Sequence, residues 1–126
     1  MSIHKTGYFR GGLRVNGIRN VANCSSTQLL DGNWHMCSMT YDGTIIKRYV
    51  DGAMKKSTAV TGTLDTSEFF IFGHYGSDTS YHCIDAAISD ARIYATALTE
   101  VQIKELYNTS MSIDNLGNIY TRELVE

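Results

Sequence analysis

The sequence contains no proline, so its tight turns must be made by other residues. Eleven glycines are present, and four of them follow asparagine or aspartate, at residues 16–17, 31–32, 42–43 and 51–52. Asn-Gly and Asp-Gly pairs between alternating apolar and polar residues are a strong signal for β-hairpins, because glycine supplies the positive φ that a tight turn needs. The composition therefore points to antiparallel strands joined by glycine turns.

Clusters of basic residues and long apolar runs are also missing. The net charge is −2 at pH 7. The chain therefore lacks the excess of positive charge that usually accompanies binding to nucleic acid or to an anionic membrane surface. No run of about 18 apolar residues occurs, so no membrane span is expected. The first five residues lack the apolar core of a secretory signal. We therefore expect no nucleic-acid partner and no membrane partner, and no signal peptide is visible.

The three cysteines, Cys24, Cys37 and Cys83, include no Cys-x-x-Cys pair. A zinc site normally uses paired spacing, so the sequence does not indicate one. Cys37 lies at a core-facing position of an expected strand, which favours a buried free thiol. One disulfide with a leftover thiol is the alternative. As a set, the cysteines suit a chain that folds in a reducing cytosol.

Hydrophobic periodicity predicts one domain over residues 1–126. The chain is long enough to bury a core, and 43% of its residues are hydrophobic. Alternation of apolar and polar side chains predicts most of the strands, with a polar loop over residues 24–28; residues 69–72 form a short, fully apolar strand, and residues 84–94 form a long strand with small residues on both faces. The expected strands cover residues 12–15, 18–22, 34–41, 45–50, 53–60, 69–72 and 84–94.

One helix is expected, over residues 97–107. Thr99 and Gln102 form a capping-box pattern, which places the helix N-cap at Thr99. The apolar residues of the helix lie mostly on one stripe and are expected to anchor it across a sheet edge. The C-terminal tail, residues 111–126, is expected to form a hairpin around a turn at residues 115–118. The anchoring residues are Leu98, Val101, Ile103 and Leu106.

Three blocks of the sequence follow one another in a fixed order. They are residues 31–43 (DGNWHMCSMTYDG), residues 49–52 (YVDG), and residues 88–94 (ISDARIY) followed by the helix. Together they resemble the laminin G-like domain of the concanavalin A-like lectin/glucanase superfamily, over most of the chain. The resemblance implies an all-β, antiparallel two-sheet jelly-roll β-sandwich with one short helix near the C-terminus.

The chain departs from this family in places. Ser89 and Ala86 stand where the family usually has aspartate and glycine. The family usually has strands upstream of the position of Tyr8. The resemblance therefore implies a trimmed first sheet, a chain that starts inside the domain, or an edge supplied by a neighbouring subunit. Since an open sheet edge invites pairing, a homo-oligomer through that edge is one expected assembly.

Catalysis is not indicated. Glucanases on this fold place two carboxylates two residues apart on one strand, and a retaining mechanism needs about 5–5.5 Å between them. The chain has no Glu-x-Asp or Asp-x-Glu pair. We expect a non-enzymatic domain without a cofactor. Some relatives bind calcium; the candidate calcium ligands here are Asp78 and Asp85, because Asp42 and Asp51 are explained as turn residues.

Sugar binding is the main functional expectation. Lectins stack an aromatic ring on the apolar face of a sugar and orient it with polar groups. The loop over residues 73–81 is longer and more polar than a turn requires, and such loops on a rigid sandwich commonly carry binding. The alternative is that its tyrosines only cover the sandwich rim. The expected ligand-binding residues are His74, Tyr75, Asp78, Tyr81 and His82.

Residues 8–10 (Tyr-Phe-Arg) form a second aromatic and cationic group. His35 is expected to pack in a structural role, and Arg92 is expected to use a buried salt bridge or hydrogen bonds to carbonyls. The remaining aromatic and apolar residues of the strands are assigned to structure, with Trp34 packed between strands. They are Trp34, Tyr41, Tyr49, Phe69, Phe72, Ile93 and Tyr94.

The sequence thus predicts a non-catalytic recognition module on a phage virion or an extracellular bacterial surface protein. Its expected partner is a glycan or a host-surface polysaccharide. The tail after Tyr107 resembles the C-terminal ends of some phage structural proteins. The competing prediction is a structural module that makes protein contacts in a virion or surface assembly, since this fold supports both roles.

Overall fold

The computed structural model describes residues 2–3, 7–66, 86–110, 112–113 and 119–120. Two three-stranded antiparallel sheets form the body of the domain. The first sheet contains β1 (Ser2–Ile3), β2 (Tyr8–Val15) and β3 (Ile18–Gln28), and the second contains β4 (Cys37–Tyr41), β5 (Ile45–Val50) and β6 (Ala53–Ala59). They are followed by the helix α1 (Glu100–Ser110) and the short pair β7 (Ser112–Ile113) and β8 (Ile119–Tyr120).

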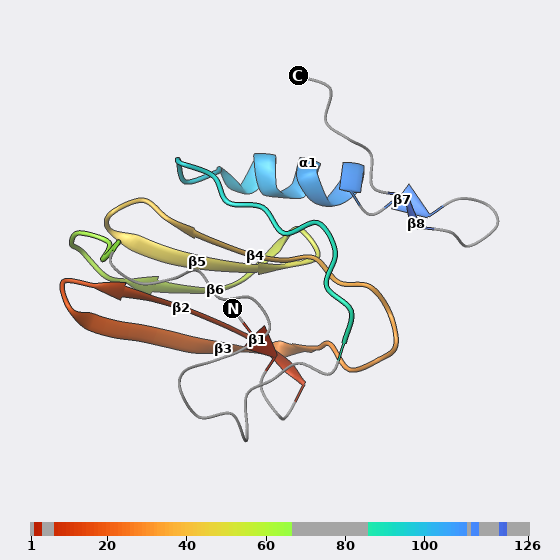
Figure 1. The fold of residues 1–126 in the computed structure, drawn as a ribbon, viewed down its shortest axis with the longest axis horizontal. Coiled ribbons are helices and arrows are strands. Elements are labelled where there is room, and N and C mark those ends of the chain that lie inside the picture. Colours follow the sequence, from red (N-terminus) through yellow and green to blue (C-terminus); the bar gives the residue numbers. More distant parts are fainter. Residues whose placement is uncertain (1, 4–6, 67–85, 111, 114–118, 121–126) are drawn as a thin grey trace.

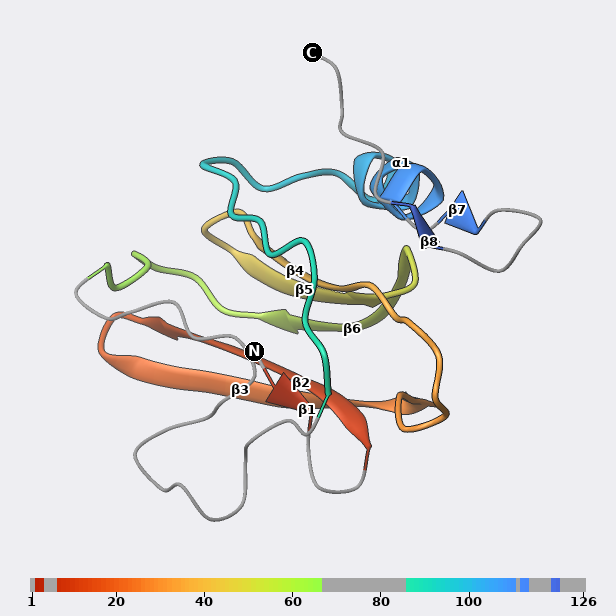
Figure 2. The same cartoon turned by 45° about the vertical axis from the view of Figure 1, so that its right-hand side comes forward.

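The described elements stack in three layers. Figures 1 and 2 show α1 on one side of the second sheet and the first sheet on the other side. The two face-to-face antiparallel sheets confirm the sandwich expected from the sequence. Because the second sheet is covered on both faces, its central strand β5 should be apolar or neutralised on both sides.

The first sheet follows from alternation and one turn. In β2, Phe9, Gly11 and Val15 are buried, while residues between them are more exposed. Asn16 and Gly17 have φ values of 50° and 75°, as a tight hairpin turn with two positive φ values requires. The predicted hairpin is therefore confirmed. Strand β3 continues to Gln28, so the prediction of a polar loop over residues 24–28 is wrong, because Cys24 and Gln28 pair with Phe9 and Tyr8 of β2 on either side of a bulge.

The second sheet contains a similar turn between β5 and β6. Asp51 and Gly52 have φ values of 53° and 75°. A Cβ on Gly52 would lie 3.0 Å from the Cβ of Tyr107 and 3.3 Å from the Cα of Lys104. Two constraints therefore favour glycine at position 52: the positive φ of the backbone and the close approach of α1. The turn between β4 and β5 is built differently, because one Asp42 carboxylate oxygen accepts bonds from the amides of residues 44 and 45.

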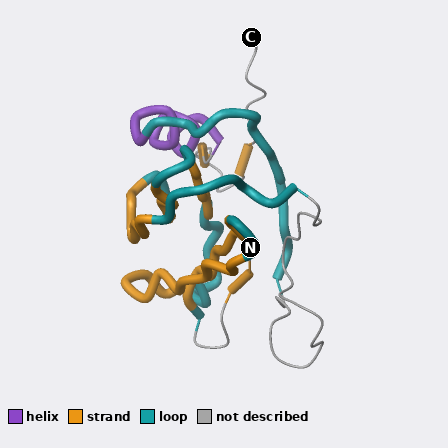
Figure 3. Tube along the Cα trace, turned by 90° about the vertical axis from the view of Figure 1, so that its left-hand side faces the viewer, coloured by secondary structure: helices purple, strands orange, loops and turns teal. Residues whose placement is uncertain are grey.

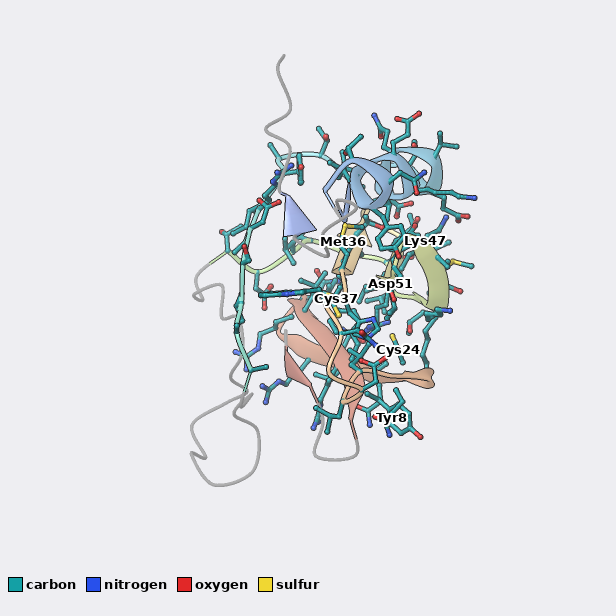
Figure 4. The ribbon with its side chains drawn as sticks, turned by 90° about the vertical axis from the view of Figure 1, so that its right-hand side faces the viewer. Tyr8, Cys24, Met36, Cys37, Lys47 and Asp51 are labelled. Atoms are coloured by element: carbon teal, nitrogen blue, oxygen red, sulfur yellow. The ribbon has the colours of Figure 1, made fainter. Side chains whose placement is uncertain are left out.

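The core lies between the two sheets. Phe9, Cys24 and Leu29 come from the first sheet and its exit, and Val50 comes from β5. Cys37 of β4 is partly buried and packs against this cluster. Cys24 and Cys37 are free thiols. Figure 4 shows the labelled side chains in order from the helix toward the first sheet: Lys47, then Asp51, then Cys24 and Tyr8.

Arg48 of β5 is fully buried in this core, which the sequence did not predict. Its Nε donates to the carbonyl oxygen of Gly11 at 2.9 Å, across the two sheets, and its Nη1 donates to the hydroxyl of Thr58 at 3.0 Å. Within the described residues its Nη2 is buried without a hydrogen-bond partner. Burial lowers the pKa of Arg48. The guanidinium therefore ties the sheets together through neutral acceptors.

On the opposite face of β5, Lys47 forms an ion pair of 2.9 Å with Glu100 at the start of α1. The predicted N-cap is confirmed, because the Gln102 amide donates to the Thr99 hydroxyl and the Thr99 amide donates to the Gln102 side chain. Ile103 is buried against the sheet, but Val101 is 67% exposed, so its assignment as an anchor is wrong. The one described helix is too short to cross a membrane.

The segment that leads to α1 is not a strand. Residues 86–94 have no β-ladder pairing, so the strand predicted over residues 84–94 is wrong over this range. Asp90 has a φ of 56°, which turns the chain out of the extended conformation. Figure 3 shows this segment running beside the strands. Ile93 and Tyr94 are therefore largely exposed, and their assignment to packing is wrong.

Arg92 of this segment also differs from expectation. Its Nε and Nη2 donate to the two carboxylate oxygens of Asp90 at 2.6 and 2.8 Å. Both side chains are partly exposed, so the predicted buried salt bridge is wrong, although an ion pair is present. The strand expected at Phe69–Phe72 lies outside the described residues. In the tail, β7 pairs antiparallel with β8.

Candidate functional site

The sequence predicts five ligand-binding residues in the loop over residues 73–81 and just after it. His74, Tyr75, Asp78, Tyr81 and His82 lie outside the described residues, as does the calcium candidate Asp85. In the second predicted group, residues 8–10, Phe9 is buried in the core, and Tyr8 and Arg10 are only partly exposed. A binding surface must therefore be sought among the other described loops.

The loop between the two sheets stands out by its exposure. Residues 30–34 (Leu-Asp-Gly-Asn-Trp) are all exposed, and they join β3 of the first sheet to β4 of the second. Leu30 is 62% exposed and Trp34 is 45% exposed. Figure 1 shows this connection projecting from one end of the sandwich. We call residues 30–34 the Trp34 loop. The prediction that Trp34 packs between strands is wrong, because β4 begins only at Cys37.

The loop is anchored at its first end by Leu29. The Leu29 side chain is buried in the core with Phe9 and Val50. Its amide donates to the carbonyl oxygen of Gly7 at 2.8 Å. A buried side chain and a backbone hydrogen bond fix the point at which the chain leaves the first sheet.

The second anchor is a histidine held between two carboxylates. His35 Nδ1 lies 2.7 Å from an Asp51 oxygen, and its Nε2 lies 3.0 Å from an Asp31 oxygen. The other Asp51 oxygen accepts from the amide of Met36 at 3.0 Å, and the Asp51 amide donates to the Met36 carbonyl. The structural role expected for His35 is thus confirmed. The β5–β6 turn holds the far end of the Trp34 loop.

Asp31 also shapes the loop from within. Its carboxylate oxygen accepts from the amide of Asn33 at 2.9 Å, an Asx turn of the type that aspartate commonly forms. Gly32 between them has a φ of 82°. The result is a short loop in which an exposed tryptophan follows directly after a closed turn.

These hydrogen bonds shift the pKa values of Asp31 and His35. The bond from the Asn33 amide, with the His35 contact, holds the pKa of Asp31 well below its usual range. Burial alone would lower the pKa of His35, but the hydrogen bonds and charges of Asp51 and Asp31 outweigh it and raise that pKa. The two carboxylates therefore favour the imidazolium form of the ring over the neutral form.

The described residues offer little for catalysis or metal binding. No group of three or more histidine, cysteine, aspartate or glutamate side chains is placed to hold a metal ion in this part of the chain. Burial raises the pKa of the Cys37 thiol to about 12 and also raises that of Cys24. Both thiols are thus protonated and poorly nucleophilic. The Trp34 loop is suited to binding.

A pH titration of stability should reveal the His35 anchor. A raised folded-state pKa gives a contribution that is complete below the ordinary histidine value of about 6.5 and is lost as pH rises through the folded pKa. We expect the free energy of unfolding, from urea denaturation, to fall as the pH rises from about 6 to 9. In His35→Gln this fall should be much smaller. An unchanged slope in that variant would contradict the anchor.

Sequence reasoning missed the Trp34 loop, although one signal was present. Residues 31–33 (Asp-Gly-Asn) are turn formers, so the tryptophan comes directly after a turn and not inside a strand. The alternation over residues 34–41 concealed this, since it continues one face of β4 backward through His35.

Comparison with known proteins agrees with this fold. Residues 4–104 match the laminin G-type family described as the concanavalin A-like lectin/glucanases superfamily. The fold is similar to a solved structure of an S-layer domain-containing protein (residues 221–444) from Clostridium thermocellum, with a TM-score of 0.53 and 24% sequence identity. The match covers 80% of this chain and 52% of that one, so the chain spans about half the length of that relative.

A search of curated proteins found no matching sequence. The family match extends over most of the chain and includes β2 to β6 and the start of α1. The layered antiparallel sheets and the capped C-terminal helix are what the resemblance in the sequence implied. The chain belongs to the concanavalin A-like lectin/glucanase superfamily, as a domain of laminin G type.

Proposed function

We propose that this domain is a non-catalytic recognition module that binds a carbohydrate through loops at the end of its sandwich. The observation that carries the proposal is the Trp34 loop, in which Trp34 and Leu30 stay in water although both ends of the loop are fixed. Anchored aromatic side chains lose little conformational freedom on binding, which makes them efficient contact residues.

The chemistry of the loop suits a sugar ring. The face of an indole can cover the apolar face of a pyranose, and the side chains of Asn33 and Asp31 beside it provide amide donors and carboxylate acceptors for hydroxyl groups. Because the Asp31 oxygen is already oriented by Asn33 and His35, the polar groups are set before the ligand arrives. This arrangement needs no bound metal.

The loop predicted from the sequence remains part of the proposal. Tyr75 and Tyr81, with His74, Asp78 and His82, would provide a second set of aromatic and polar contacts. If that loop also binds, Tyr75→Ala and Tyr81→Ala should weaken binding of the same glycan. Variants that leave binding unchanged would assign the loop to the sandwich rim.

We further propose that the module acts at a cell surface. The support is the S-layer domain-containing relative, which is similar in fold. The absence of any Glu-x-Asp or Asp-x-Glu pair in the sequence supports a role without turnover. The location on a virion rests on the sequence of the tail and stays a prediction.

Trp34→Ala should weaken glycan binding by about tenfold or more, as expected when a contact worth about 1.4 kcal/mol or more is removed. The measurement is isothermal titration with the best ligand from a glycan array. Tyr94→Ala is the matched control, because Tyr94 is an aromatic residue of almost equal exposure, 44%, on the segment before α1. Equal losses in both variants would contradict a binding role specific to the Trp34 loop.

One observation favours the structural alternative. Ile88, Ile93 and Tyr94 are exposed on a segment with no β-ladder pairing over residues 86–94, and exposed apolar segments can mark protein contacts. An assembly module would give no response on a broad glycan array. It would instead form an oligomer that Ile88→Ser or Ile93→Ser dissociates, as sedimentation velocity would show.

A further inference from the structure

Both ring nitrogens of His35 face carboxylate oxygens, at 2.7 Å from Asp51 and 3.0 Å from Asp31. An ionised carboxylate only accepts hydrogen bonds, so both contacts require an N–H on the ring. A neutral imidazole has one N–H and one lone pair. It can therefore keep only one of these two bonds, and its second nitrogen then faces an acceptor.

The contact with Asp31 is the one that should break. The Asp51 bond is shorter, and Asp51 is held in place by the amide of Met36. Asp31 is the more exposed of the two carboxylates, with 41% of its side chain accessible against 28% for Asp51. Loss of a proton from His35 thus frees the Asp31 end of the Trp34 loop, while His35 remains attached to the β5–β6 turn.

The groups around His35 come from several elements. Asp31 belongs to the loop itself, and Asp51 belongs to the turn that precedes β6. Cys37 of β4 lies close enough to Asp51 for that charge to raise its pKa. Helix α1 brings Lys104 and Tyr107 against the same turn at Gly52. With His35 protonated, the Asp31–His35–Asp51 cluster carries one net negative charge.

We propose that protonation of His35 locks the Trp34 loop in its binding form, so that the loop takes an uncharged sugar more tightly in mildly acidic than in mildly alkaline solution. The inference rests on the proposed function and adds its regulation and ligand class. The negative cluster disfavours uronic and other acidic sugars, and its charge doubles when His35 loses its proton. A loop that is already fixed loses less conformational entropy when it binds the sugar.

The lock can be tested without a ligand, since Trp34 is the only tryptophan. Its emission and acrylamide quenching should change with pH along a single titration with a midpoint above about 6.5. Asp31→Asn should abolish the transition, because the amide oxygen can accept from the protonated ring and the amide N–H can donate to the lone pair of the neutral ring. Asp42→Asn is the matched control, a turn aspartate in the β4–β5 connection, and should keep it. Identical titrations in both variants would overturn the lock.

Binding is then measured on the intact chain at pH 5.5 and pH 8.5, with neutral gluco-, manno- and galacto-oligosaccharides and with oligogalacturonate as the acidic probe. We expect about fivefold or greater weakening at the higher pH for the neutral ligand, and none in Asp31→Asn. Affinity independent of pH, or preference for the acidic probe, would overturn the inference alone. A normal tryptophan titration without binding of any glycan at either pH would overturn the proposed function.

Discussion

Replacing Arg48 with alanine is expected to destabilise the domain by about 3 kcal/mol or more. The substitution empties a large buried volume between the sheets and leaves the Gly11 carbonyl and the Thr58 hydroxyl without their donor. A cavity and an unsatisfied buried carbonyl each cost free energy. Urea unfolding followed by circular dichroism would show the loss as a lower midpoint at an unchanged slope.

The variant Arg48→Met separates the two causes of this loss, which are the empty volume and the missing hydrogen bonds. Methionine keeps much of the volume and removes a desolvated cation whose bonds go to neutral acceptors, a trade that is often tolerated in protein cores. We expect this variant to be more stable than Arg48→Ala by about 2 kcal/mol. If both variants are equally unstable, the hydrogen bond to Gly11 outweighs packing. If neither is destabilised, Arg48 does not join the sheets.

Phe9→Ala should be at least as damaging, at about 3–5 kcal/mol. Phe9 is 1% exposed and packs with Cys24, Leu29 and Val50 between the sheets. A domain of ordinary stability, about 5–15 kcal/mol, would lose a large share of it. Because Leu29 belongs to the same cluster, the Trp34 loop should also lose its first anchor. Amide hydrogen exchange should therefore rise at residues 29–34 as well as in the sheets.

Ile18→Ala is the matched control for Phe9→Ala. Ile18 lies in β3 of the same sheet but is 67% exposed. Its truncation should change the free energy of unfolding by about 0.5 kcal/mol or less. Comparable losses in the two variants would mean that Phe9 does not lie in a packed core between the sheets.

The hairpins could be predicted because their cause is local. Asn16-Gly17 and Asp51-Gly52 each supply two residues that accept positive φ, and the structure uses both. The helix start at Thr99 is likewise set within four residues, by reciprocal bonds with Gln102. In these places the sequence carries the whole of the interaction, so no knowledge of the remaining chain is required.

Features that depend on residues distant in the sequence could not be predicted in the same way. Cys24 lies in a polar run, yet pairing with β2 makes it part of a strand and of the core. Arg48 would be expected on the surface, but two acceptors from other strands allow its burial. Residues 86–94 were predicted to belong to a strand with small residues on both faces, but β-ladder pairing is absent over this range, and Asp90 turns the chain.

The candidate site was not predicted from the sequence for the same reason. Trp34 adjoins a run that alternates as a strand should, but ladder pairing begins only at Cys37, and His35 and Met36 bind the Asp51 carboxylate. Asp51 is sixteen residues away from His35. The neighbouring sequence correctly predicted Asp51 as a turn residue, but it contains no signal that Asp51 also anchors His35.

The most direct measurement is the indole N–H signal of Trp34 in a proton–nitrogen correlation spectrum, recorded at about pH 6 during titration with a bound neutral oligosaccharide. A chain with one tryptophan gives one such signal. Contact with the ligand predicts a saturable shift of this signal with the same affinity as calorimetry, accompanied by shifts at residues 30–35. A glycan that binds while the indole signal stays in place would contradict the central claim that this exposed ring is the contact surface.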